Sequence, residues 1–316
     1  MWFLIGAMSS FEEAVAVWVL GTKHKKPEQC QDRVKIVNAI GSRIGEGNVR
    51  LMYYEDLTIK VDAEGLYLYE KGVAIKPPKV ILNRIASSEG ITEFIMPLLR
   101  QLEYLGVIIC NSSNATMLAT HKFLHLQELA SNKIPIASTF SYSAVDLSEV
   151  NTTLVDNELG YPQIMKSVHG SQGSKVVLLP TPDLVSEMTH VLNHQVPYLF
   201  QDYIKESHGR DMRVFVVDNE AVFAMIRSSN TSSVKANLSA GGIAEVVTGK
   251  YPDAEALAVR ICHHLKMDIA GVDLLFSDKY GYVCCEVNNC PGLSKSIYEG
   301  TGVEDKIAEM IVRKLR

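Results

Sequence analysis

The sequence predicts an α/β protein with α+β lobes, and three observations lead to that fold class. Apolar runs of about four to eight residues, the length of buried strands, alternate with longer segments whose apolar residues recur at helical spacing. Turn-forming residues separate these runs. Hydrophobic residues make up 47% of the 316 residues, which is the usual share in a globular chain with a substantial core.

Residues 1–112 are predicted to form an N-terminal α/β domain, because strand-like and helix-like runs alternate there. The first parallel strand is expected at residues 2–5, with a helix or loop over residues 14–20. A helix is expected at residues 32–44, since its apolar residues roughly follow helical spacing and Gly45 stops it. The other predicted elements are strands at residues 49–54, 79–83 and 107–110, a hairpin over residues 66–75 and a helix at residues 92–106.

Residues 113–200 are predicted to form a central domain. Residues 111–120 are rich in Ser, Asn and Thr, which marks the boundary before it. The Gly- and Ser-rich residues 169–175 lie between two strands and could bring backbone N–H groups close to a phosphate, although an ordinary hairpin turn is the alternative. The predicted elements are helices at residues 121–130 and 183–195 and strands at residues 134–139, 161–166, 176–179 and 198–204.

Residues 201–316 are predicted to form a C-terminal domain. A turn at residues 277–281 would fold the strand at residues 269–276 back against residues 283–287 as a hairpin. The other predicted elements are a strand at residues 221–226 and helices at residues 253–266 and 304–315.

This hairpin predicts a metal site. Side chains of a strand alternate between its two faces, so Glu286 and Asn288 point the same way, and Asp273 lies on the partner strand. Two carboxylates and an amide oxygen suit a hard cation such as Mg²⁺ that also binds nucleotide phosphates. The alternative is a set of solvated polar residues on the open face of a sheet.

Other polar residues are candidates for binding a nucleotide. Lys122 and Lys166 could each reach a phosphate as a point charge, although a surface position is the alternative for each. Asp211 and Arg213 share a strand face, where the acid could bind ribose hydroxyls and the arginine a phosphate or carboxylate; a structural Asp–Arg pair is the competitor. The backbone of residues 201–204 could hydrogen-bond the edge of an adenine. Residues 235–237 are polar and have little bulk, so they could border a bound phosphate or substrate.

Charge and cysteine usage exclude several classes of partner. A net charge of −5 and a pI near 6.0 argue against nucleic acid and against an anionic membrane. The six cysteines show no CxxC pair, which favours a reduced, cytoplasmic compartment. The apolar N-terminal run has no basic flank and is interrupted by Glu12 and Glu13, so neither a signal peptide nor a membrane span is expected.

These segments, in this order, resemble the ATP-grasp superfamily, and within it the RimK-type carboxylate–amine ligases, over nearly the whole chain. Residues 2–4, 139–142, 197–201 and 205–211 look most like the branch of N-acetylaspartylglutamate and β-citrylglutamate synthases. Residues 10–26 resemble an insertion relative to that branch, and residues 289–292 are more similar to bacterial protein-glutamylating relatives. The residues that carry the resemblance are Arg84, Lys122, Lys166, Gln201, Asp202, Tyr203, Ile204, Asp211, Arg213, Arg227, Lys235, Ala236, Asn237, Asp273, Glu286 and Asn288.

The resemblance implies an ATP-grasp fold behind an N-terminal Rossmann-like domain, and a ligase that uses ATP with one or two Mg²⁺ or Mn²⁺ ions. ATP would phosphorylate a substrate carboxylate, and the amino group of L-glutamate would then displace phosphate to leave an amide. Arg213 and Arg227 would steady the acylphosphate, and Arg84 would grip a carboxylate of the acceptor, which is N-acetylaspartate or citrate in that branch.

Two alternatives to this function stay open at the level of sequence. The first is a glutamate ligase that acts on a protein C-terminus or a cofactor tail. Such a ligase needs an open groove for its acceptor, whereas a ligase that acts on a free acid needs a closed, cationic pocket. The second is a catalytically silent nucleotide-binding scaffold. The oligomeric state is left open between monomer and homo-oligomer.

Overall fold

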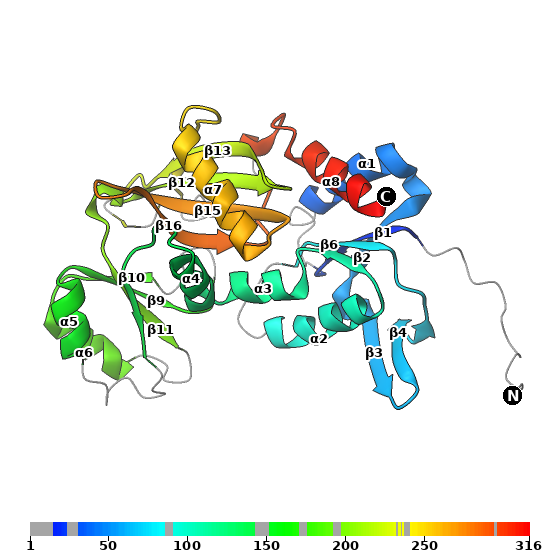
Figure 1. Cartoon of the computed structure of the whole chain (residues 1–316), viewed down its shortest axis with the longest axis horizontal. Coiled ribbons are helices and arrows are strands. Elements are labelled where there is room, and N and C mark those ends of the chain that lie inside the picture. Colours follow the sequence, from blue (N-terminus) through cyan, green and yellow to red (C-terminus); the bar gives the residue numbers. More distant parts are fainter. Residues whose placement is uncertain are drawn as a thin grey trace, which may run out of the picture.

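A computed structural model describes residues 15–23, 31–85, 91–142, 152–170, 176–191, 197–231, 233–234, 236, 241–293 and 296–316. These residues build three four- or five-stranded sheets and one small three-stranded sheet. The strand expected at residues 2–5 lies outside the described residues. Figure 1 shows the sheets side by side, with the C-terminal helix returning to the N-terminal sheet.

The N-terminal sheet is parallel, with strand order β2-β1-β6-β7. All five residues of β1 are buried. Val17 and Val19 face the core that contains α1, whereas Trp18 and Leu20 face the core that contains α2, so a helix covers each face. The elements are β1 (Val17–Gly21), α1 (Gln31–Ile44), η2 (Glu46–Asn48), β2 (Val49–Tyr53), β6 (Val80–Asn83), α2 (Ile91–Tyr104) and β7 (Ile108–Cys110).

The prediction of a helix or loop over residues 14–20 was wrong, because β1 is a central strand of this sheet. A strand that is buried on both faces has a continuous apolar sequence without alternation, and such a run cannot be told from a buried helix by its periodicity. The other strands and helices predicted within residues 32–110 are confirmed to within a few residues. A Rossmann-like assignment of this domain stays a prediction.

A small antiparallel sheet projects from the N-terminal sheet (Figure 1). The predicted hairpin over residues 66–75 forms its strands β4 and β5, and β3 was missed because its side chains are mostly exposed and its sequence has no continuous apolar run. Its elements are η3 (Tyr54–Asp56), β3 (Leu57–Asp62), β4 (Gly65–Glu70) and β5 (Val73–Ala74).

The Ser-, Asn- and Thr-rich segment forms a helix, α3 (Ser113–Thr120), rather than an irregular connection. The Ser112 side chain caps it by accepting a hydrogen bond of 3.2 Å from the Ala115 N–H, which is the role that serine favours at a helix start. The predicted helix at residues 121–130 is confirmed as α4 (Lys122–Ser131). Both helices pack into the core of the C-terminal sheet through Ala115, Ala119 and Leu129.

The central sheet is antiparallel, with strand order β10-β9-β11-β8, and has its own small core around Met165 and Phe200. The strand predicted at residues 134–139 was wrong in extent: Ile136 makes one isolated bridge to Cys284, and β8 begins at Thr139. The elements are β8 (Thr139–Ser141), α5 (Thr153–Leu159), β9 (Gln163–Ser167), β10 (Val176–Leu179), α6 (Pro182–Val191) and β11 (Tyr198–Asp202).

The C-terminal sheet is antiparallel, with strand order β14-β13-β12-β15-β16, and the predicted hairpin of residues 269–287 is confirmed as β15 and β16. α7 packs on one face of the sheet, and α8 packs on the other face and against α1. The elements are η5 (Lys205–Ser207), β12 (Arg210–Val217), β13 (Glu220–Ser228), β14 (Ile243–Val246), α7 (Pro252–Leu265), β15 (Ile269–Ser277), β16 (Gly281–Asn288), η7 (Ser296–Tyr298) and α8 (Val303–Leu315).

One core therefore joins the N-terminal and C-terminal sheets. It contains residues of β1, α1, β6, β12, β13 and α8, and the central sheet has a separate core. The limits expected for the three domains, at residues 112 and 200, stay predictions.

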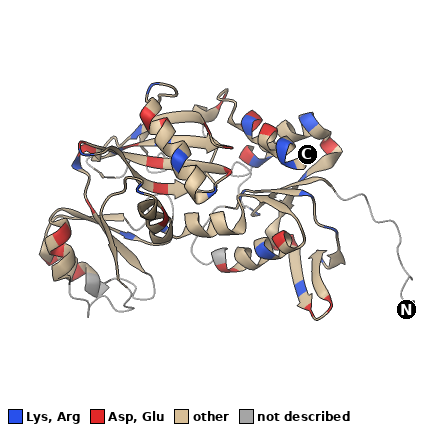
Figure 2. Ribbon diagram, in the orientation of Figure 1, with Lys and Arg blue, Asp and Glu red and all other residues tan. Residues whose placement is uncertain are grey.

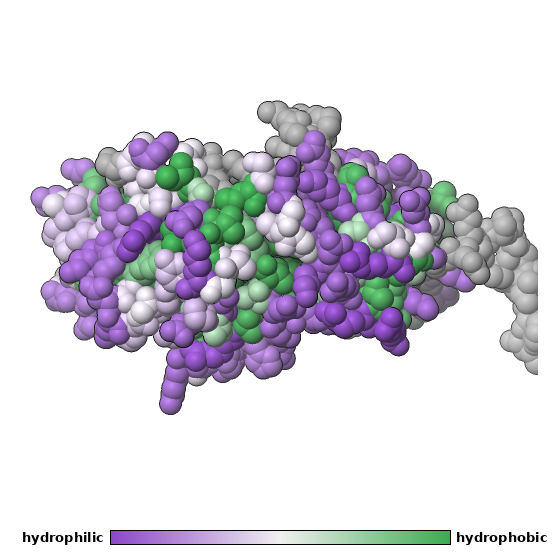
Figure 3. Space-filling model, turned by 90° about the horizontal axis from the view of Figure 1, so that it is seen from above, coloured by the Kyte–Doolittle hydropathy of each residue, from purple (hydrophilic) through white to green (hydrophobic). Residues whose placement is uncertain are grey.

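Charged residues of both signs are interspersed along the elements drawn in Figure 2. Figure 2 shows both signs of charge along α1, α7 and α8, and the face in Figure 3 is mostly hydrophilic, with apolar side chains in limited groups. Among the described residues, no helix has the length and apolar character that a membrane crossing requires.

Candidate active site

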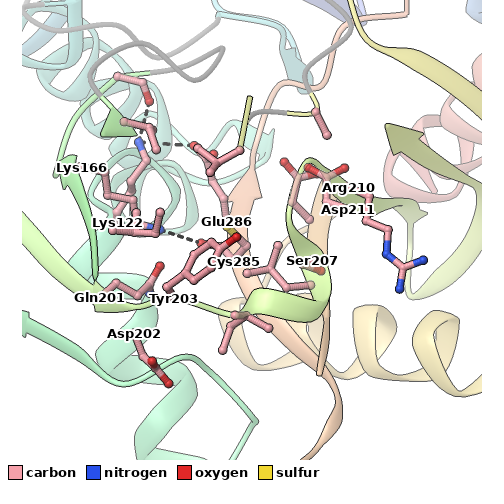
Figure 4. A pocket seen from close by; sticks show the side chains of 18 residues that line it. Lys122, Lys166, Gln201, Asp202, Tyr203, Ser207, Arg210, Asp211, Cys285 and Glu286 are labelled. Carbon is pink, nitrogen blue, oxygen red and sulfur yellow. Dashed lines mark hydrogen bonds and ion pairs between the residues drawn. The ribbon is translucent and has the colours of Figure 1, made fainter. Parts of the chain in front are cut away.

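A pocket of about 120 Å³ lies between the central and C-terminal sheets (Figure 4). Side chains from α4, β9, β11, β12, β15 and β16 line this pocket. The fold therefore brings together segments that are far apart in the sequence. Ten of the residues predicted from the sequence line it: Lys122, Lys166, Gln201, Asp202, Tyr203, Ile204, Asp211, Ala236, Asp273 and Glu286.

Two buried lysines point at the same part of this pocket. Lys122 begins α4, and its Nζ donates a 2.6 Å hydrogen bond to the Gly170 carbonyl and lies 3.4 Å from Glu286 Oε1. Lys166 lies on β9, and its Nζ is 3.4 Å from the carbonyl oxygen of Cys285. Figure 4 shows both lysines on one side of Glu286. Because both side chains are buried, the surface-lysine alternative does not hold for either.

The three predicted metal ligands lie on the paired strands β15 and β16. Asp273 is opposite Glu286, and Asn288 is opposite Gly271, two residues further along the same face. The Asn288 amide nitrogen donates to the Gly271 carbonyl at 3.4 Å, so its amide oxygen is not used in that bond. Asp273 is 4% exposed, which excludes the alternative of a fully solvated residue for this position.

A β-bulge at Cys285 is what brings Glu286 to this face. The register shifts between Asp273 and Leu274, so that Leu274 pairs with Cys284 and Asp273 with Glu286. Cys284 packs in the core below α7, while both Cys285 and Glu286 line the pocket. Bulges of this kind re-aim side chains beside functional sites.

The oxygen ligands fit a hard divalent cation. Glu286 and Asp273 supply carboxylates and Asn288 an amide, which is the ligand chemistry that Mg²⁺ and Mn²⁺ prefer. Among the described residues no group of three or more His, Cys, Asp and Glu side chains gathers at one point. A cation here would therefore take its remaining ligands from water or from a phosphate.

Four charged side chains form a network beside the pocket; Arg227 and Asp273 are buried, and Asp211 and Arg213 are partly buried. Arg213 Nε and Nη2 each donate 2.7 Å bonds to Asp273, and Arg227 Nε and Nη2 each donate 2.7 Å bonds to Asp211. Arg227 Nη2 also lies 3.0 Å from Asp273 Oδ2. Asp211 is therefore held in a two-point pair with Arg227, and Arg213 and Arg227 do not line the pocket themselves.

Burial and the two arginines act in opposite directions on these acids. Burial raises the pKa of Asp211 above its usual value, despite the neighbouring Arg227 guanidinium. At Asp273 burial also favours the neutral form, but Arg213 and Arg227 outweigh it and lower the pKa. Asp273 consequently carries a negative charge at neutral pH.

The segment from Gln201 to Ile204 borders two cavities. Its residues Asp202, Tyr203 and Ile204 line the pocket and also a second cavity of about 490 Å³, which the turn after β15 closes from the other side. The Gln201 amide donates a 2.7 Å bond to Thr139 Oγ1. This side chain therefore ties β11 to β8 and leaves the backbone of the segment to border the pocket.

Arg84 lies away from the pocket, at the seam between the N-terminal and C-terminal sheets. It is 1% exposed, and its Nη2 donates to Asp32 Oδ2 at 2.9 Å and to the Pro291 carbonyl at 2.7 Å. Its buried Nε and Nη1 have no hydrogen-bond partner among the described residues. Two further candidates, Lys235 and Asn237, lie outside the described residues, and Ala236 between them lines the pocket.

Several lining residues were not predicted. Ile164 and Leu275 lie two positions from Lys166 and Asp273 on the same strand faces, so strand periodicity could have found them. Ser207 and Arg210 lie in the segment 205–211 that carries the resemblance but were not chosen as site residues; a short 3₁₀ turn brings Ser207 to the pocket. Cys285, which was not among the predicted site residues, lines the pocket because of the bulge.

Comparisons with known proteins agree with this architecture. A family model described as RimK-like ATP-grasp domain matches residues 119–311, which is more than half of the chain. N-acetylaspartylglutamate synthase A of Homo sapiens is 34% identical over 278 residues, covering 86% of this chain and 69% of that protein. Beta-citrylglutamate synthase B of Danio rerio is 31% identical over 278 residues, covering 86% and 67%.

A solved structure extends the likeness to the whole fold. The RimK domain ATP-grasp protein from Sphaerobacter thermophilus DSM 20745 matches with a TM-score of 0.68 at 20% identity, over 93% of this chain and 99% of that chain. At this identity the likeness establishes the ATP-grasp fold alone. Together with the family match, it shows that the chain belongs to the RimK-like ATP-grasp family of ATP-dependent carboxylate–amine ligases, enzymes that use ATP and divalent metal ions.

Proposed function

We propose that this protein uses ATP to join the amino group of L-glutamate to a carboxylate of a small acid, with N-acetylaspartate and citrate as the first candidates. The single observation that carries the proposal is the arrangement of Lys122 and Lys166 opposite Glu286 and Asp273 in one pocket. The products named for the similar synthases supply the choice of acids and of glutamate.

The two lysines would bind the phosphates of ATP. Each Nζ is held by a backbone carbonyl, Gly170 for Lys122 and Cys285 for Lys166, so both cations are already oriented before a nucleotide arrives. Pre-oriented charges stabilise a transferring phosphoryl group more than mobile ones, since little reorganisation is needed during the reaction. The backbone of residues 202–204 would border the adenine.

Asp273, Glu286 and Asn288 would hold one or two Mg²⁺ or Mn²⁺ ions. A bound cation would neutralise negative charge on the phosphates. The carboxylate of the acid would attack the terminal phosphorus and release ADP, and the resulting acylphosphate would lose phosphate when the glutamate amine attacks its carbonyl carbon. Arg213 and Arg227 would steady the charge of the transferred group from behind Asp273 and Asp211, since they do not line the pocket themselves.

The choice of a small acid over a protein tail rests on the products named for the similar synthases. Arg84 would grip a second carboxylate of that acid. It is buried away from the pocket, and two of its donors have no partner among the described residues. A buried donor without a partner is costly, so an acceptor long enough to reach from the pocket to this seam would satisfy both.

The experiment incubates the pure protein with ATP, Mg²⁺, L-glutamate and a panel of acids, and measures product masses and phosphate release. We expect a product whose mass is that of one acid plus glutamate less water, and phosphate release that needs both substrates. Transfer of glutamate to a peptide C-terminus and to no free acid would favour the protein-modifying alternative. An absence of release with every acceptor would favour the silent scaffold.

A further inference from the structure

Two histidines lie where α3 ends and α4 begins, next to Lys122. His169 Nδ1 is 3.1 Å from the Thr120 carbonyl oxygen at the end of α3. A carbonyl oxygen can only accept a hydrogen bond, so Nδ1 carries a proton and donates it. His121 Nδ1 accepts a 3.2 Å bond from the Leu124 N–H and so caps the start of α4. The two rings meet edge to face with their centroids 5.1 Å apart, and both side chains therefore hold this corner between the helices.

Residues 168–170 are docked on the same corner by three hydrogen bonds. The backbone N–H of Lys122 donates a 3.1 Å bond to the Val168 carbonyl. Its Nζ donates a 2.6 Å bond to the Gly170 carbonyl, and the bond made by His169 lies between these two along the chain. The first N–H groups and the last carbonyls of a helix have no partner within the helix. This docking supplies one partner to the end of α3 and one to the start of α4.

The docking sets the position of one pocket lysine relative to the other. Residues 168–170 directly follow β9, the strand that carries Lys166. Val168 is fully buried, and its N–H donates a 2.9 Å bond to the Pro197 carbonyl, so the end of β9 is fixed in the core. Lys122 begins the helix on the other side of the joint. A change in the joint would therefore move Lys122 while Lys166 stays in place.

The bond from His169 is the part of the docking that depends on the side chain at position 169. It fixes the backbone directly before Gly170, whose carbonyl orients the Lys122 ammonium. That ammonium has a second acceptor, since Glu286 Oε1 lies 3.4 Å away. If the Gly170 carbonyl moved, Lys122 would turn to Glu286. The ammonium would then be withdrawn from a phosphate and would compete with a cation for that carboxylate.

We propose that His169 is a positioning residue for the nucleotide site. Its bond to Thr120 holds the Gly170 carbonyl in place. That carbonyl keeps the Lys122 ammonium directed at the phosphates and away from Glu286. His169 does not line the pocket, so it acts through Lys122 and not by contact with the nucleotide. The inference rests on the proposed function for the role of Lys122 as a phosphate ligand.

The first experiment measures the Kd of ADP with Mg²⁺ by calorimetry for two variants of His169. His169→Phe keeps a ring against His121 but removes the donor, and its Kd should rise about threefold to tenfold, as expected for one lost hydrogen bond. His169→Asn places an amide nitrogen where Nδ1 lies, which keeps the bond to Thr120, so its Kd should stay within about twofold of the wild type.

The matched control is His263→Phe. His263 also meets a second histidine edge to face, with centroids 5.8 Å apart, but it is exposed on α7, and no described residue of α7 lines the pocket. Its Kd for ADP should equal that of the wild type.

The second experiment asks whether His169 acts through Lys122. Lys122→Ala should bind ADP at least about tenfold more weakly, because the phosphates lose a charged partner. In the Lys122→Ala background, His169→Phe should change the Kd by less than about twofold, since no ammonium is left to position. A histidine that only stabilised the fold would weaken binding by the same factor in both backgrounds.

The outcomes are separable. A wild-type Kd in His169→Phe, an equal loss in both backgrounds, or no recovery in His169→Asn overturns this inference alone. Lys122→Ala that binds ADP as tightly as the wild type overturns it together with the phosphate role of Lys122. Normal ADP behaviour without glutamate ligation counts against the proposed substrates alone. Thermal unfolding checks each variant, and His169→Leu, which also removes the donor, replaces His169→Phe if that variant does not fold.

Discussion

At the scale of single residues, Lys166 gives a direct test of the phosphate site. Its buried Nζ faces the strand that carries Glu286, with the Cys285 carbonyl 3.4 Å away. A hydrogen bond between a charged group and its partner contributes about 1.5–3 kcal/mol, so Lys166→Ala should weaken ADP binding about tenfold to a hundredfold. Calorimetry with ADP and Mg²⁺ checks this.

The matched control for Lys166→Ala is Lys250→Ala. The Lys250 side chain is 61% exposed and pairs with Glu245 at the surface, an arrangement that contributes little. Its ADP affinity should equal that of the wild type. Equal affinities in all three proteins would remove Lys166 from the nucleotide site.

His125 gives a prediction on pH dependence. It lies fully buried on α4, and burial, followed by the charges of Lys166 and Lys122, lowers its pKa to about 3. Below a pH of about 6.5 the unfolded chain binds a proton on this residue that the native protein does not bind, so stability falls as the pH falls from about 6.5 towards 3.

The test compares the wild type with His125→Gln by urea unfolding at two pH values. Between a pH of about 7 and one of about 5, the wild type should lose about 2 kcal/mol more stability than the variant, because the variant has no imidazole to protonate on unfolding. The other histidines contribute alike to both proteins. Equal losses would show that His125 binds a proton in the native state.

Single residues also show how far sequence reasoning could go. Lys166, Asp273 and Glu286 were predictable, because a charged residue inside an apolar strand is rare and the period of two assigns it a face. The pairing of Asp211 with Arg227 was not predictable. It depends on the register between β12 and β13, which long-range hydrogen bonds set.

At the scale of elements, Gly271 on β15 gives a prediction about packing around the metal-ligand strands. A Cβ at this position would lie 3.0 Å from Pro291 Cβ and 3.6 Å from Arg213 Nε. Gly271→Ala should therefore displace the segment that follows β16 and lower stability by about 1–3 kcal/mol, as overpacking does. Urea unfolding measures the change.

Gly47→Ala is the control for this substitution. A Cβ at Gly47 would meet no atom within 4 Å, so this variant should be as stable as the wild type within about 0.5 kcal/mol. Equal free energies of unfolding for Gly271→Ala and Gly47→Ala would show that Pro291 leaves room for a Cβ at position 271, against this prediction.

The elements also show which sequence patterns carry information. The β15–β16 hairpin was predictable from two apolar runs around a polar turn. β1 was missed because its apolar run lacks any period, and the bulge at Cys285 left no pattern in the sequence because it only changes which residues face the pocket.

At the scale of the whole molecule, α8 makes the N-terminal and C-terminal sheets one unit. Its buried residues Ile307, Met310 and Ile311 lie in the core shared with α1 and β12. Removing most of a buried isoleucine costs about 2–5 kcal/mol, so Ile307→Ala should destabilise both sheets together. Leu154→Ala, at a leucine that is 61% exposed, should change stability by less than about 0.5 kcal/mol.

Tryptophan fluorescence can follow the N-terminal sheet by itself. The chain has two tryptophans, and in a Trp2→Phe background the signal comes from Trp18, which is buried on the face of β1 away from α8. Ile307→Ala should shift the Trp18 transition and the circular dichroism transition by the same amount. A Trp18 transition that stays in place would mean that the two sheets unfold independently.

The secondary structure of the whole chain was more predictable from the sequence than the long-range contacts between its elements. Alternating strands and helices indicated the parallel and antiparallel sheets, but the return of α8 to α1 joins residues more than 250 positions apart, and no local pattern encodes such a contact.

That return has a consequence for synthesis in the cell. While a ribosome is still producing the middle of the chain, α1 can pack on β1 and β2, but the apolar side chains that α8 will cover stay exposed. The core on this face of the first sheet is therefore incomplete until residues 303–315 have left the exit tunnel. Newly made chains should accordingly depend on chaperones that shield apolar surface for most of the translation time.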